Sequence, residues 1–289
     1  MKRIAILGCE NSHANAFLKF VKENEEFADV EVVGVYSDDS AAAEKLRETF
    51  GVPVMAEYAD AVGKIDGLVI TARHGDNHYE YAKPYIDSGI PMFIDKPITV
   101  SETDAVAFMK QLKEKGVRIS GGSSLKQDAF VQQLKHERET EVGGETLGGY
   151  VRAPFQEDNV YGGFYFYAQH LVEMVCEIFG RFPLSVTAKR NGKQIHVLFH
   201  YEQYDCVGLF CDGSYRYFAA RMAQSASNGG EIASTNDWFY KEFKEFYGIL
   251  SGDAQTVTYS EFISPVFLMN AIMRSLESGR EETLCYSEI

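Results

Sequence analysis

The chain has 289 residues, about twice the length of a typical domain, which predicts two domains. Hydrophobic residues make up 45% of it and charged residues 24%, a composition that excludes a disordered or low-complexity protein. Its 28 basic and 42 acidic residues give a net charge of −14, so neither nucleic acid nor an anionic membrane surface is expected as a partner. A few local donors can still hold an anionic cofactor against this charge.

Cysteine usage and the first residues indicate the compartment. The five cysteines are an odd number at scattered positions without a C-x-x-C, so neither a disulfide framework nor a zinc knuckle is expected. The apolar stretch after Met1-Lys2-Arg3 is too short for a signal peptide, and no apolar run approaches the ~18 residues of a membrane span. We therefore expect a soluble, cytoplasmic protein with reduced thiols.

Short apolar, β-branched runs alternate with helical stretches from the first residues to about residue 120. Uninterrupted apolar strands that alternate with helices predict a parallel sheet covered on both faces, which is a Rossmann-type α/β domain. The expected strands cover residues 4–7, 30–36, 67–71, 92–94 and 117–119, and the expected helices cover residues 12–22, 41–50, 77–88 and 102–115.

The second half of the chain changes to strands whose residues alternate between two faces. Asn191-Gly192 and Asp212-Gly213 are hairpin-turn dipeptides. The pattern predicts an antiparallel meander, with residues 195, 197, 199 and 201, then 207, 209 and 211, then 215, 217 and 219 on its covered face. Helices over 165–179, 238–250 and 261–278 would cover that face. The sequence thus predicts a Rossmann-like domain over residues 1–122 and an α+β domain with an open antiparallel sheet over residues 123–289.

Gly8 follows the first expected strand, where a dinucleotide-binding fold places its phosphate-binding turn. The full fingerprint is G-x-G-x-x-G, and the chain reads G-C-E-N-S-H from Gly8 to His13, with only the first glycine present. Asn11 or Ser12 would cap the next helix, whose backbone N–H groups also favour an anion. The turn is compatible with capping alone, and with capping combined with pyrophosphate binding by Gly8, Asn11 and Ser12.

Glu10 and His13 stand where the second and third glycines would be, which predicts weaker dinucleotide binding. Two unit charges 5 Å apart repel by about 3 kcal/mol at an effective dielectric of ~20, and the third glycine normally allows close helix packing. Ser37 or Asp38 would bind the adenosine ribose after the second strand, although Asp38 or Asp39 equally suits a cap of the following helix. Ser37 takes the usual acidic position, so NAD is favoured over NADP only modestly.

Lys96 carries the strongest pattern in the sequence. It precedes Pro97 at the carboxyl end of an expected parallel strand, which is the edge where such sheets bind ligands, although a lone K-P also fits a surface turn. The surrounding segment resembles the Gfo/Idh/MocA oxidoreductases, the family of glucose–fructose oxidoreductase and inositol dehydrogenase. In that family a strand ends in T-P, a histidine follows, a glycine lies eleven residues further on, and E-K-P begins six residues after the glycine. His78, Gly89 and Asp95 keep this register.

Three departures accompany this resemblance. Ala72 replaces the proline, Asp95 replaces the glutamate, and two extra residues separate Thr71 from His78. The resemblance implies that Thr71, His78 and Asp95 belong to the cofactor site together with Lys96.

The resemblance continues around His170, which follows Gly162-Gly163 and precedes Gly180 as the family's active-site histidine does. The family's aspartate four residues before the histidine is Phe166 here. Further substrate contacts are expected from four residues. Lys126 and Glu173 stand where relatives carry a basic and an acidic residue, and Tyr161 and Tyr167 could line a sugar-sized pocket. A metal site is not expected, because His170 and Glu173 are two ligands without a third.

The resemblance implies reversible hydride transfer between NAD or NADP and a secondary alcohol of a sugar, cyclitol or related polyol. His170 would be the general base, and Lys96 would stabilise the charge that develops on the same oxygen. Three other functions stay open. One is an NAD-using glycosidase without net redox change, and the second is a non-catalytic nucleotide- or sugar-binding sensor, which Phe166 and the incomplete glycine turn favour. The third is a plain structural or interaction module, which would explain neither the Lys96 register nor the His170 match. The outer face of the second sheet is the expected interface of a homo-oligomer.

Overall fold

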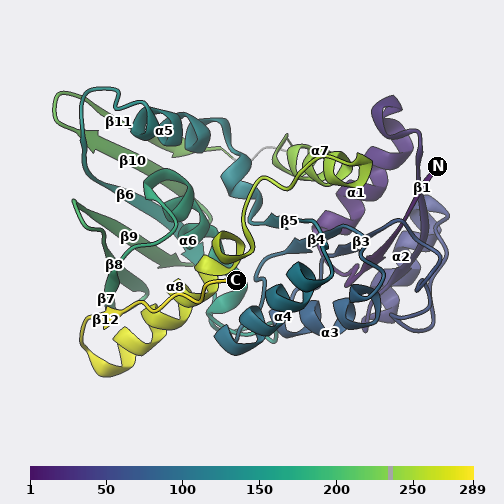
Figure 1. The fold of residues 1–289 in the computed structure, drawn as a ribbon. Coiled ribbons are helices and arrows are strands. Elements are labelled where there is room, and N and C mark those ends of the chain that lie inside the picture. The colour runs from purple at the N-terminus through teal and green to yellow at the C-terminus, as the bar shows by residue number, and fades with distance from the viewer. Residues whose placement is uncertain (234–236) are drawn as a thin grey trace.

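A computed structural model describes residues 1–233 and 237–289 and contains two sheets, which lie in opposite halves of the view in Figure 1. The first is a five-stranded sheet with the order β2-β1-β3-β4-β5 and parallel pairing throughout. Its strands are β1 (Lys2–Leu7), β2 (Val30–Tyr36), β3 (Gly67–Ile70), β4 (Met92–Asp95) and β5 (Ile119–Gly122). The Rossmann-type sheet that the alternating pattern predicts is therefore confirmed.

Helices cover both faces of this sheet because its strands are apolar on both sides. One face packs Ile4, Ile6, Val69 and Phe93 against three helices, and the other packs Leu68, Ile70 and Ile94 against two. The first group of helices is α1 (Ser12–Glu23), α2 (Ser40–Phe50) and α7 (Asp237–Ser251), and the second is α3 (Gly75–Ile86) and α4 (Glu102–Glu114). Helix α3 begins two residues earlier than expected, because the side chain of His74 accepts the backbone N–H of Asp76.

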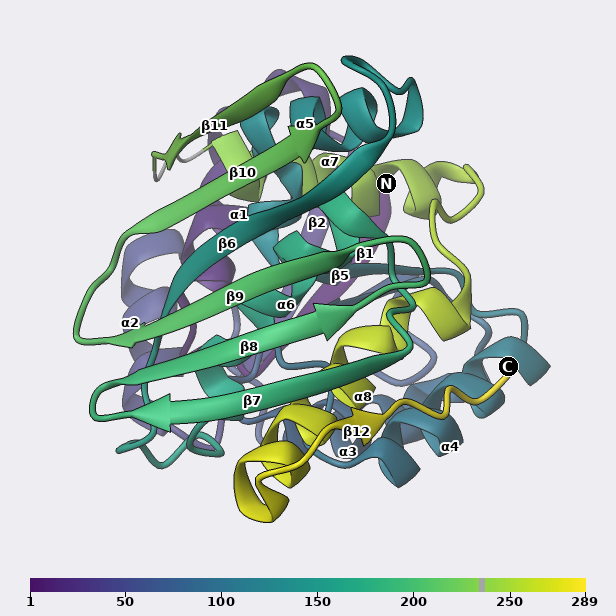
Figure 2. The ribbon, with the colours of Figure 1, turned by 90° about the vertical axis from the view of Figure 1, so that its left-hand side faces the viewer.

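The second sheet has seven strands in the order β11-β10-β6-β9-β8-β7-β12. It is mixed, because β6 and β9 pair in parallel and every other pair is antiparallel. Its strands are β6 (Thr146–Phe155), β7 (Ser185–Asn191), β8 (Gln194–His200), β9 (Asp205–Asp212), β10 (Tyr217–Ala223), β11 (Ser227–Ile232) and β12 (Glu282–Thr283). Helices α5 (Ala129–Glu139), α6 (Tyr165–Phe179) and α8 (Tyr259–Ser278) lie behind it, and its outer face is open to the viewer in Figure 2.

The expected meander is correct for one hairpin and wrong for the next. Asn191-Gly192 lies at the turn between β7 and β8, as predicted. Asp212-Gly213 does not form a hairpin, because β10 pairs with β6 and β11, and β6 lies between β9 and β10. The face of β9 also differs from the prediction: Cys206, Gly208 and Phe210 are buried, and Val207 is on the outer face.

Helix α7 was expected to cover the second sheet, and it packs on the first instead. Phe243, Phe246 and Ile249 of α7 share one core with Phe17 of α1 and Phe93 of β4. Figure 1 shows α7 beside α1, although strands β2 to β5 of the first sheet and β6 to β11 of the second lie between them in sequence. The C-terminal half therefore supplies one of the covering layers of the N-terminal sheet.

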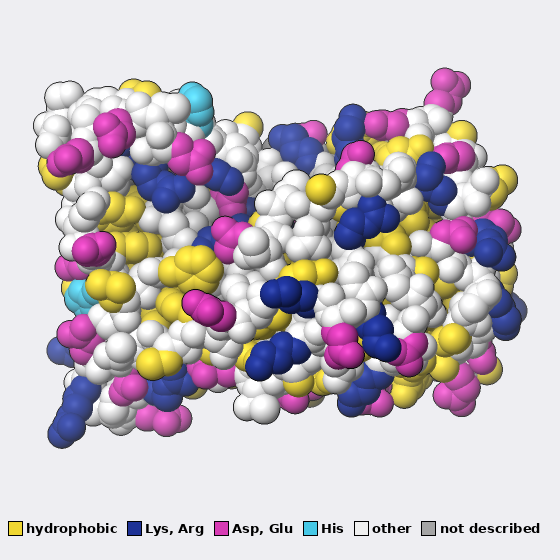
Figure 3. Space-filling view, viewed as in Figure 1, with side chains coloured by type: hydrophobic (Ala, Val, Ile, Leu, Met, Phe, Trp, Pro, Cys, Tyr) yellow, Lys and Arg dark blue, Asp and Glu magenta, His cyan; other side chains and the backbone are white. Residues whose placement is uncertain are grey.

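Both acidic and basic side chains are spread over the face that Figure 3 shows, as the composition predicts for a solvated surface. Within residues 1–233 and 237–289, none of the helices is long and apolar enough to cross a membrane.

Candidate active site

A cavity of about 390 Å³ lies between the two sheets, at the carboxyl ends of the parallel strands. We call it the Lys96 cavity. The first turn of α1, the chain after β3 and β4, the segment after β5, and helices α6 and α7 all contribute to its wall. Its lining residues are Asn11, Ser12, His13, Arg73, Lys96, Ser124, Leu125, Gln156, Phe166, Tyr167, His170, Tyr217, Trp238 and Phe239. Two residues predicted to be catalytic, Lys96 and His170, are thus brought together although they are far apart in sequence.

Lys96 is 5% exposed at the end of β4 and is surrounded by aromatic groups. Its Nζ lies 4.5 Å from the centroid of the Phe166 ring and 5.4 Å from that of Tyr167, and it donates to the carbonyl oxygen of Phe166 at 3.4 Å. Burial lowers the pKa of Lys96, the adjacent Asp95 carboxylate opposes that shift, and the charge of Arg73 adds to it. Phe166, which replaces the family's aspartate, therefore binds the ammonium through its ring and backbone rather than through a carboxylate.

His170 is 8% exposed on α6, and its Nδ1 lies 2.7 Å from the Oγ of Ser123. The Ser123 Oγ also accepts the backbone N–H of Leu125 at 3.3 Å, which fixes the hydroxyl. When the imidazole carries its hydrogen on Nδ1 and donates to Ser123, the lone pair of Nε2 is available to take a proton. Burial and the charge of Lys96 lower the pKa of His170 well below 6.5, so the ring is neutral at pH 7.

A buried polar cluster behind Lys96 was not predicted. The Nδ1 of His13 lies 3.2 Å from Oδ2 of Asp95, and its Nε2 lies 3.1 Å from Oε2 of Glu242 on α7. Burial raises the pKa of Asp95 to about 6, raises that of Glu242 well above its usual range, and lowers that of His13. His13 thus occupies the third glycine position with a side chain that links α1, β4 and α7. In the sequence, the one sign of this cluster was Glu242, an acidic residue among the aromatic residues of α7.

The turn after β1 has the conformation that its glycine requires. Gly8 has φ +72°, and a Cβ there would lie 2.3 Å from the backbone of Ala72, so only glycine fits. The side chain of Asn11 caps α1 by accepting the backbone N–H of Ser12 at 2.7 Å, and its amide donates to Asp95 Oδ2 at 2.7 Å. Asn11 therefore caps the helix, and both Asn11 and Ser12 line the Lys96 cavity.

A second cavity of about 270 Å³ lies at the carboxyl end of β2, and we call it the Asp38 cavity. Glu10, Ser37, Asp38 and Tyr161 line it, which places two predicted ribose ligands beside the residue predicted to repel phosphate. The Glu10 carboxylate accepts the hydroxyl of Ser37 at 2.7 Å and the backbone N–H of Arg73 at 2.9 Å. Asp38 accepts the hydroxyls of Tyr36 and Tyr81 at 2.7 and 2.8 Å.

Thr71 and His78 make backbone contacts next to these cavities and line neither. Thr71 Oγ1 donates to the carbonyl of Gly8 at 3.0 Å, which ties the end of β3 to the turn. His78 is fully buried, with Nε2 at 2.7 Å from the carbonyl of Ala72 and Nδ1 at 3.3 Å from that of Ile98. Burial lowers its pKa to about 4. Both side chains hold the loops beside these two cavities.

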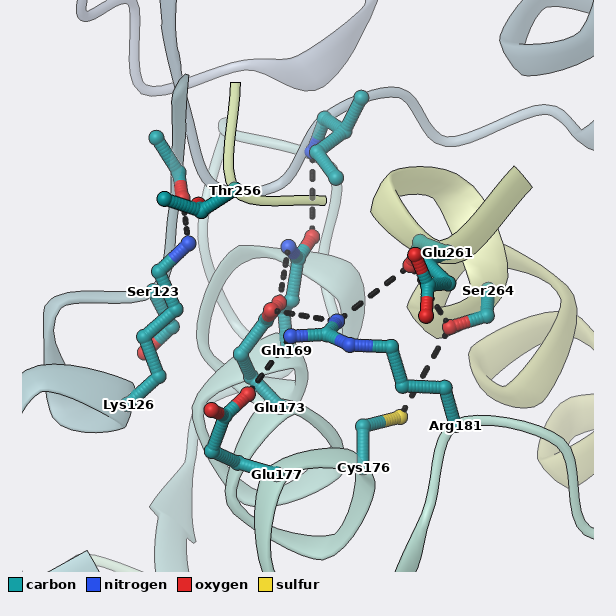
Figure 4. A network of polar contacts seen from close by, with 12 residues as sticks. Ser123, Lys126, Gln169, Glu173, Cys176, Glu177, Arg181, Thr256, Glu261 and Ser264 are labelled. Carbon is teal, nitrogen blue, oxygen red and sulfur yellow. Dashed lines mark hydrogen bonds and ion pairs between the residues drawn. The ribbon is translucent and has the colours of Figure 1, made fainter. Parts of the chain in front are cut away.

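Lys126 and Glu173 do not line the Lys96 cavity. The amino group of Lys126 donates to the carbonyl of Gly121 and lines a third cavity of about 390 Å³ with Lys135, Glu177 and Arg181, which we call the Arg181 cavity. Glu173 accepts from Gln169 Nε2 at 3.0 Å and pairs with Arg181 at 3.3 Å (Figure 4). The short segment after β5 turns Ser124 toward one cavity and Lys126 toward the other.

The two tyrosines predicted to contact substrate line different cavities, Tyr167 the Lys96 cavity and Tyr161 the Asp38 cavity. Arg73 lines the Lys96 cavity and contacts Tyr161. Tyr167 lines the Lys96 cavity, with its ring 5.3 Å from that of His170. The Tyr161 hydroxyl accepts from Arg73 Nη1 at 3.0 Å, and the guanidinium lies 5.1 Å from the centroid of that ring. Arg73 lies in the piece with two extra residues between Thr71 and His78, and sequence reasoning did not select it.

Comparison with known proteins supports the Rossmann fold of the first sheet and its similarity to oxidoreductases. Residues 2–123 match a model described as the oxidoreductase family with an NAD-binding Rossmann fold, GFO_IDH_MocA. The chain is 27% identical over 123 residues to the uncharacterized oxidoreductase YhhX of Escherichia coli (strain K12), a match that covers 39% of this chain and 35% of that protein. The match therefore spans about a third of that relative's length.

Solved structures match the chain over both sheets. The myo-inositol dehydrogenase from Corynebacterium glutamicum ATCC 13032 has a TM-score of 0.83 at 17% identity and covers 99% of this chain and 100% of its own. The WlbA dehydrogenase from Chromobacterium violaceum, in complex with NADH and UDP-GlcNAcA, has a TM-score of 0.81 at 16% identity and covers 99% of this chain and 97% of its own. These structures share the two-sheet fold of this chain. Residues 2–123 match the model of the Gfo/Idh/MocA oxidoreductase family, in agreement with the resemblance seen around Lys96.

Proposed function

We propose that this protein transfers a hydride between NAD and a secondary alcohol of a sugar, cyclitol or related polyol. The observation that carries the proposal is the shared cavity of Lys96 and His170, which opens beside the first turn of α1. A lysine and a neutral histidine on one cavity are an electrophile and a base for the same hydroxyl group.

The residues on both sides of the glycine turn fit a dinucleotide. Gly8 brings the chain close to the loop after β3, and the N-terminal turn of α1 presents Asn11 and Ser12 at the crevice. Ser37 and Asp38 lie at the end of β2, where the adenosine ribose would lie. Bound NAD would supply the hydride acceptor. Thr71, His78 and Asp95 would support this site by fixing the loops around it.

His170 and Lys96 have different roles at the substrate oxygen, one as a base and the other as a hydrogen-bond donor. His170 Nε2 takes the hydroxyl proton, since Nδ1 is engaged with Ser123. Lys96 donates a hydrogen bond to the same oxygen and stabilises its negative charge as the hydride leaves the carbon. Tyr167 supplies an aromatic wall beside His170. In this scheme Tyr161 acts on the substrate through Arg73, while Lys126 and Glu173 contribute from outside the cavity by holding the segment after β5 and helix α6.

NAD is favoured over NADP by the charge of the Asp38 cavity. Three carboxylates, Glu10, Asp38 and Asp39, line it and would repel a 2′-phosphate. Glu10 is bound to Ser37 and the Arg73 backbone, so its charge stays beside the pyrophosphate path. Titration calorimetry should therefore show tighter NAD binding by Glu10→Gly than by the unmodified protein, with NADP weaker in both.

The function is tested first by cofactor binding and then by turnover. Trp238 is the chain's one tryptophan and lines the Lys96 cavity, so energy transfer from it to NADH reports occupancy there. We expect NADH to bind, and a panel of inositols and aldoses with NAD to show absorbance growth at 340 nm. Failure of NAD, NADH, NADP and NADPH to bind would refute the cofactor assignment.

A non-catalytic sensor of the same family is the second candidate. The observation that favours it is Phe166, whose ring and carbonyl contact the amino group that a catalytic lysine would present to substrate. A sensor would bind sugar and dinucleotide without any change at 340 nm. Retained cofactor with product formation and no net change at 340 nm would instead indicate the NAD-using glycosidase.

The outer face of the second sheet is proposed as the interface of a homo-oligomer. Tyr150 and Leu198 flank Val207 on neighbouring strands, and Val207 and Met222 are 38% and 47% exposed. An open sheet face with exposed apolar side chains is typical of an association surface. Light scattering on the unmodified protein and on Val207→Glu should show an oligomer that the charge disrupts.

A further inference from the structure

We infer that the substrate carries a carboxylate, as a sugar acid does, and that Arg73 binds this carboxylate while Lys96 binds the reacting oxygen. The inference rests on the proposed function and narrows its substrate class. The Lys96 cavity holds two basic side chains, and none of its lining residues is an aspartate or glutamate. A protein with a net charge of −14 has many carboxylates available, so a cavity with the opposite charge indicates an anionic ligand.

Neither cation of this cavity has an ion-pair partner within 4.0 Å among residues 1–233 and 237–289. Lys96 is nearly fully buried against the Phe166 and Tyr167 rings, and Arg73 contacts the Tyr161 ring and hydroxyl. Buried or half-buried cations are normally paired with a carboxylate, so two that rely on aromatic rings leave positive charge for a ligand to neutralise.

The carboxylates of Asp95 and Glu10 are engaged by groups other than the two cationic side chains. Asp95 accepts hydrogen bonds from Asn11 and from the backbone N–H of Lys96, and it lies 3.2 Å from His13. Asp95 can offset the charge of Lys96 from behind. Glu10 accepts the backbone N–H of Arg73, and its second oxygen is bound to Ser37, so the Arg73 guanidinium has no comparable carboxylate.

Arg73 is held in one orientation with part of its donor edge unused. The structure gives its guanidinium one hydrogen bond, from Nη1 to the Tyr161 hydroxyl, and one ring contact. A single guanidinium matches the two oxygens of a carboxylate through parallel N–H donors. A phosphate ester would need more charge and more donors than this side chain supplies. Ser124 and Gln156 provide neutral groups for hydroxyls around it.

The reaction balances with NAD as the oxidant. The C–H bond beside the reacting hydroxyl breaks, and its hydride passes to NAD to give NADH. The O–H proton passes to Nε2 of His170, and the carbon–oxygen bond becomes a carbonyl. The carboxylate takes no part in the electron transfer; its attachment to Arg73 fixes which hydroxyl faces Lys96.

The test compares carboxylates with their neutral amides, which have nearly the same shape. The probes are D-glucuronate, D-galacturonate and D-gluconate, each against its own amide, with D-glucose 6-phosphate as the competing anion. Quenching of Trp238 measures binding with and without NAD, and absorbance at 340 nm measures turnover. We expect at least one carboxylate to bind at least tenfold more tightly than its amide.

Three variants connect this preference to Arg73. Arg73→Gln should abolish the tenfold preference, and Arg73→Lys should retain part of it because the charge remains. Arg47→Gln is the matched control, since Arg47 is an exposed arginine of α2 that pairs with Glu44 and loses the same charge. It should keep the full preference.

Several outcomes would overturn the inference. They are a preference below tenfold for every carboxylate in the unmodified protein, a preference that survives in Arg73→Gln, and tighter binding of the sugar phosphate than of any carboxylate. Loss of NADH affinity in Arg73→Gln with an unchanged preference would assign Arg73 to the cofactor instead. An Arg73-dependent preference in a protein that binds no NADH would support the anionic ligand and refute the proposed function, so the two failures are distinguishable.

Discussion

The Lys96 cavity and the Arg181 cavity lie on opposite sides of the segment after β5, and each contains basic side chains, but their charges are used differently. In the Arg181 cavity, Glu177 pairs with Arg181 at 2.6 Å (Figure 4), and it also pairs with Lys135 at 2.6 Å. In the Lys96 cavity, the cations rest on aromatic rings. The ion pairs of the Arg181 cavity hold helices α5 and α6 together. Lys96 and Arg73 have no ion-pair partner within 4.0 Å in the described part of the chain, so they leave positive charge for a ligand, although Asp95 offsets part of that on Lys96.

Removing the guanidinium of Arg181 should give the largest loss of stability. Arg181→Leu leaves Glu173 and Glu177 buried with incomplete pairing, which costs about 3–5 kcal/mol of unfolding free energy. Urea unfolding measures it. The exposed pair of Lys83 with Glu80 is the control, and Lys83→Met should cost less than about 1 kcal/mol. Equal losses in the two variants would contradict a structural role for the Arg181 cavity.

Removing the amino group of Lys96 should act on turnover and leave the fold intact. Lys96→Met keeps the stem that packs on Phe166 and loses the donor to the reacting oxygen, so kcat should fall by at least ~100-fold. Circular dichroism checks the fold. Lys135→Met removes a lysine from the Arg181 cavity and should retain turnover. Near-full activity of Lys96→Met on a true substrate would refute the mechanism.

The pH profile of alcohol oxidation should lack the fall that an ordinary histidine base produces. His170 must be neutral to accept a proton, and burial beside Lys96 lowers its pKa well below 6.5, so it stays neutral as the pH falls through that value. At pH 5.5 an unperturbed histidine base would have cost about tenfold in kcat/KM. We expect no decline of kcat/KM centred at pH 6.5, and a decline centred there would contradict the buried, neutral assignment of His170.

Ser123 should contribute the smallest of these effects. Ser123→Ala removes the hydrogen bond to Nδ1 of His170 while leaving the base in place, which is a loss of about 1 kcal/mol or roughly fivefold in kcat. The same change in a His170→Ala background should have no further effect on turnover. An equal loss in both backgrounds would show that Ser123 acts on the segment after β5 and not through the histidine.

Local patterns predicted the parts of the fold that depend on neighbouring residues. Apolar runs separated by helices predicted the parallel sheet, and the spacing from His78 to Lys96 predicted the resemblance that the family model supports. The position of β6 between β9 and β10 was not predictable in this way, because strand order depends on pairing between distant segments. Helix α7 likewise has an amphipathic pattern that fits either sheet, and only the tertiary structure selects the first.

Local sequence patterns likewise predicted some residues of the candidate site and missed others. Lys96 and His170 were found because both keep a motif register. Arg73 was missed because it lies in the piece with two extra residues, where no register applies. The contact of His13 with Glu242 joins residues from the two ends of the chain, so neither one alone indicated a buried cluster. Lys126 was placed by its position after β5, but a single turn there directs it to the Arg181 cavity.

The return of α7 to the first sheet also affects when the protein can fold on the ribosome. Residues 1–122 leave the ribosome with one apolar face still lacking Phe243, Phe246 and Ile249. Those side chains emerge only after nearly the whole second sheet has been synthesised. The first domain must therefore remain incomplete during most of translation, and its final consolidation coincides with that of the second domain. Selection for a working active site and for a nascent chain that avoids aggregation consequently acts on the same helix.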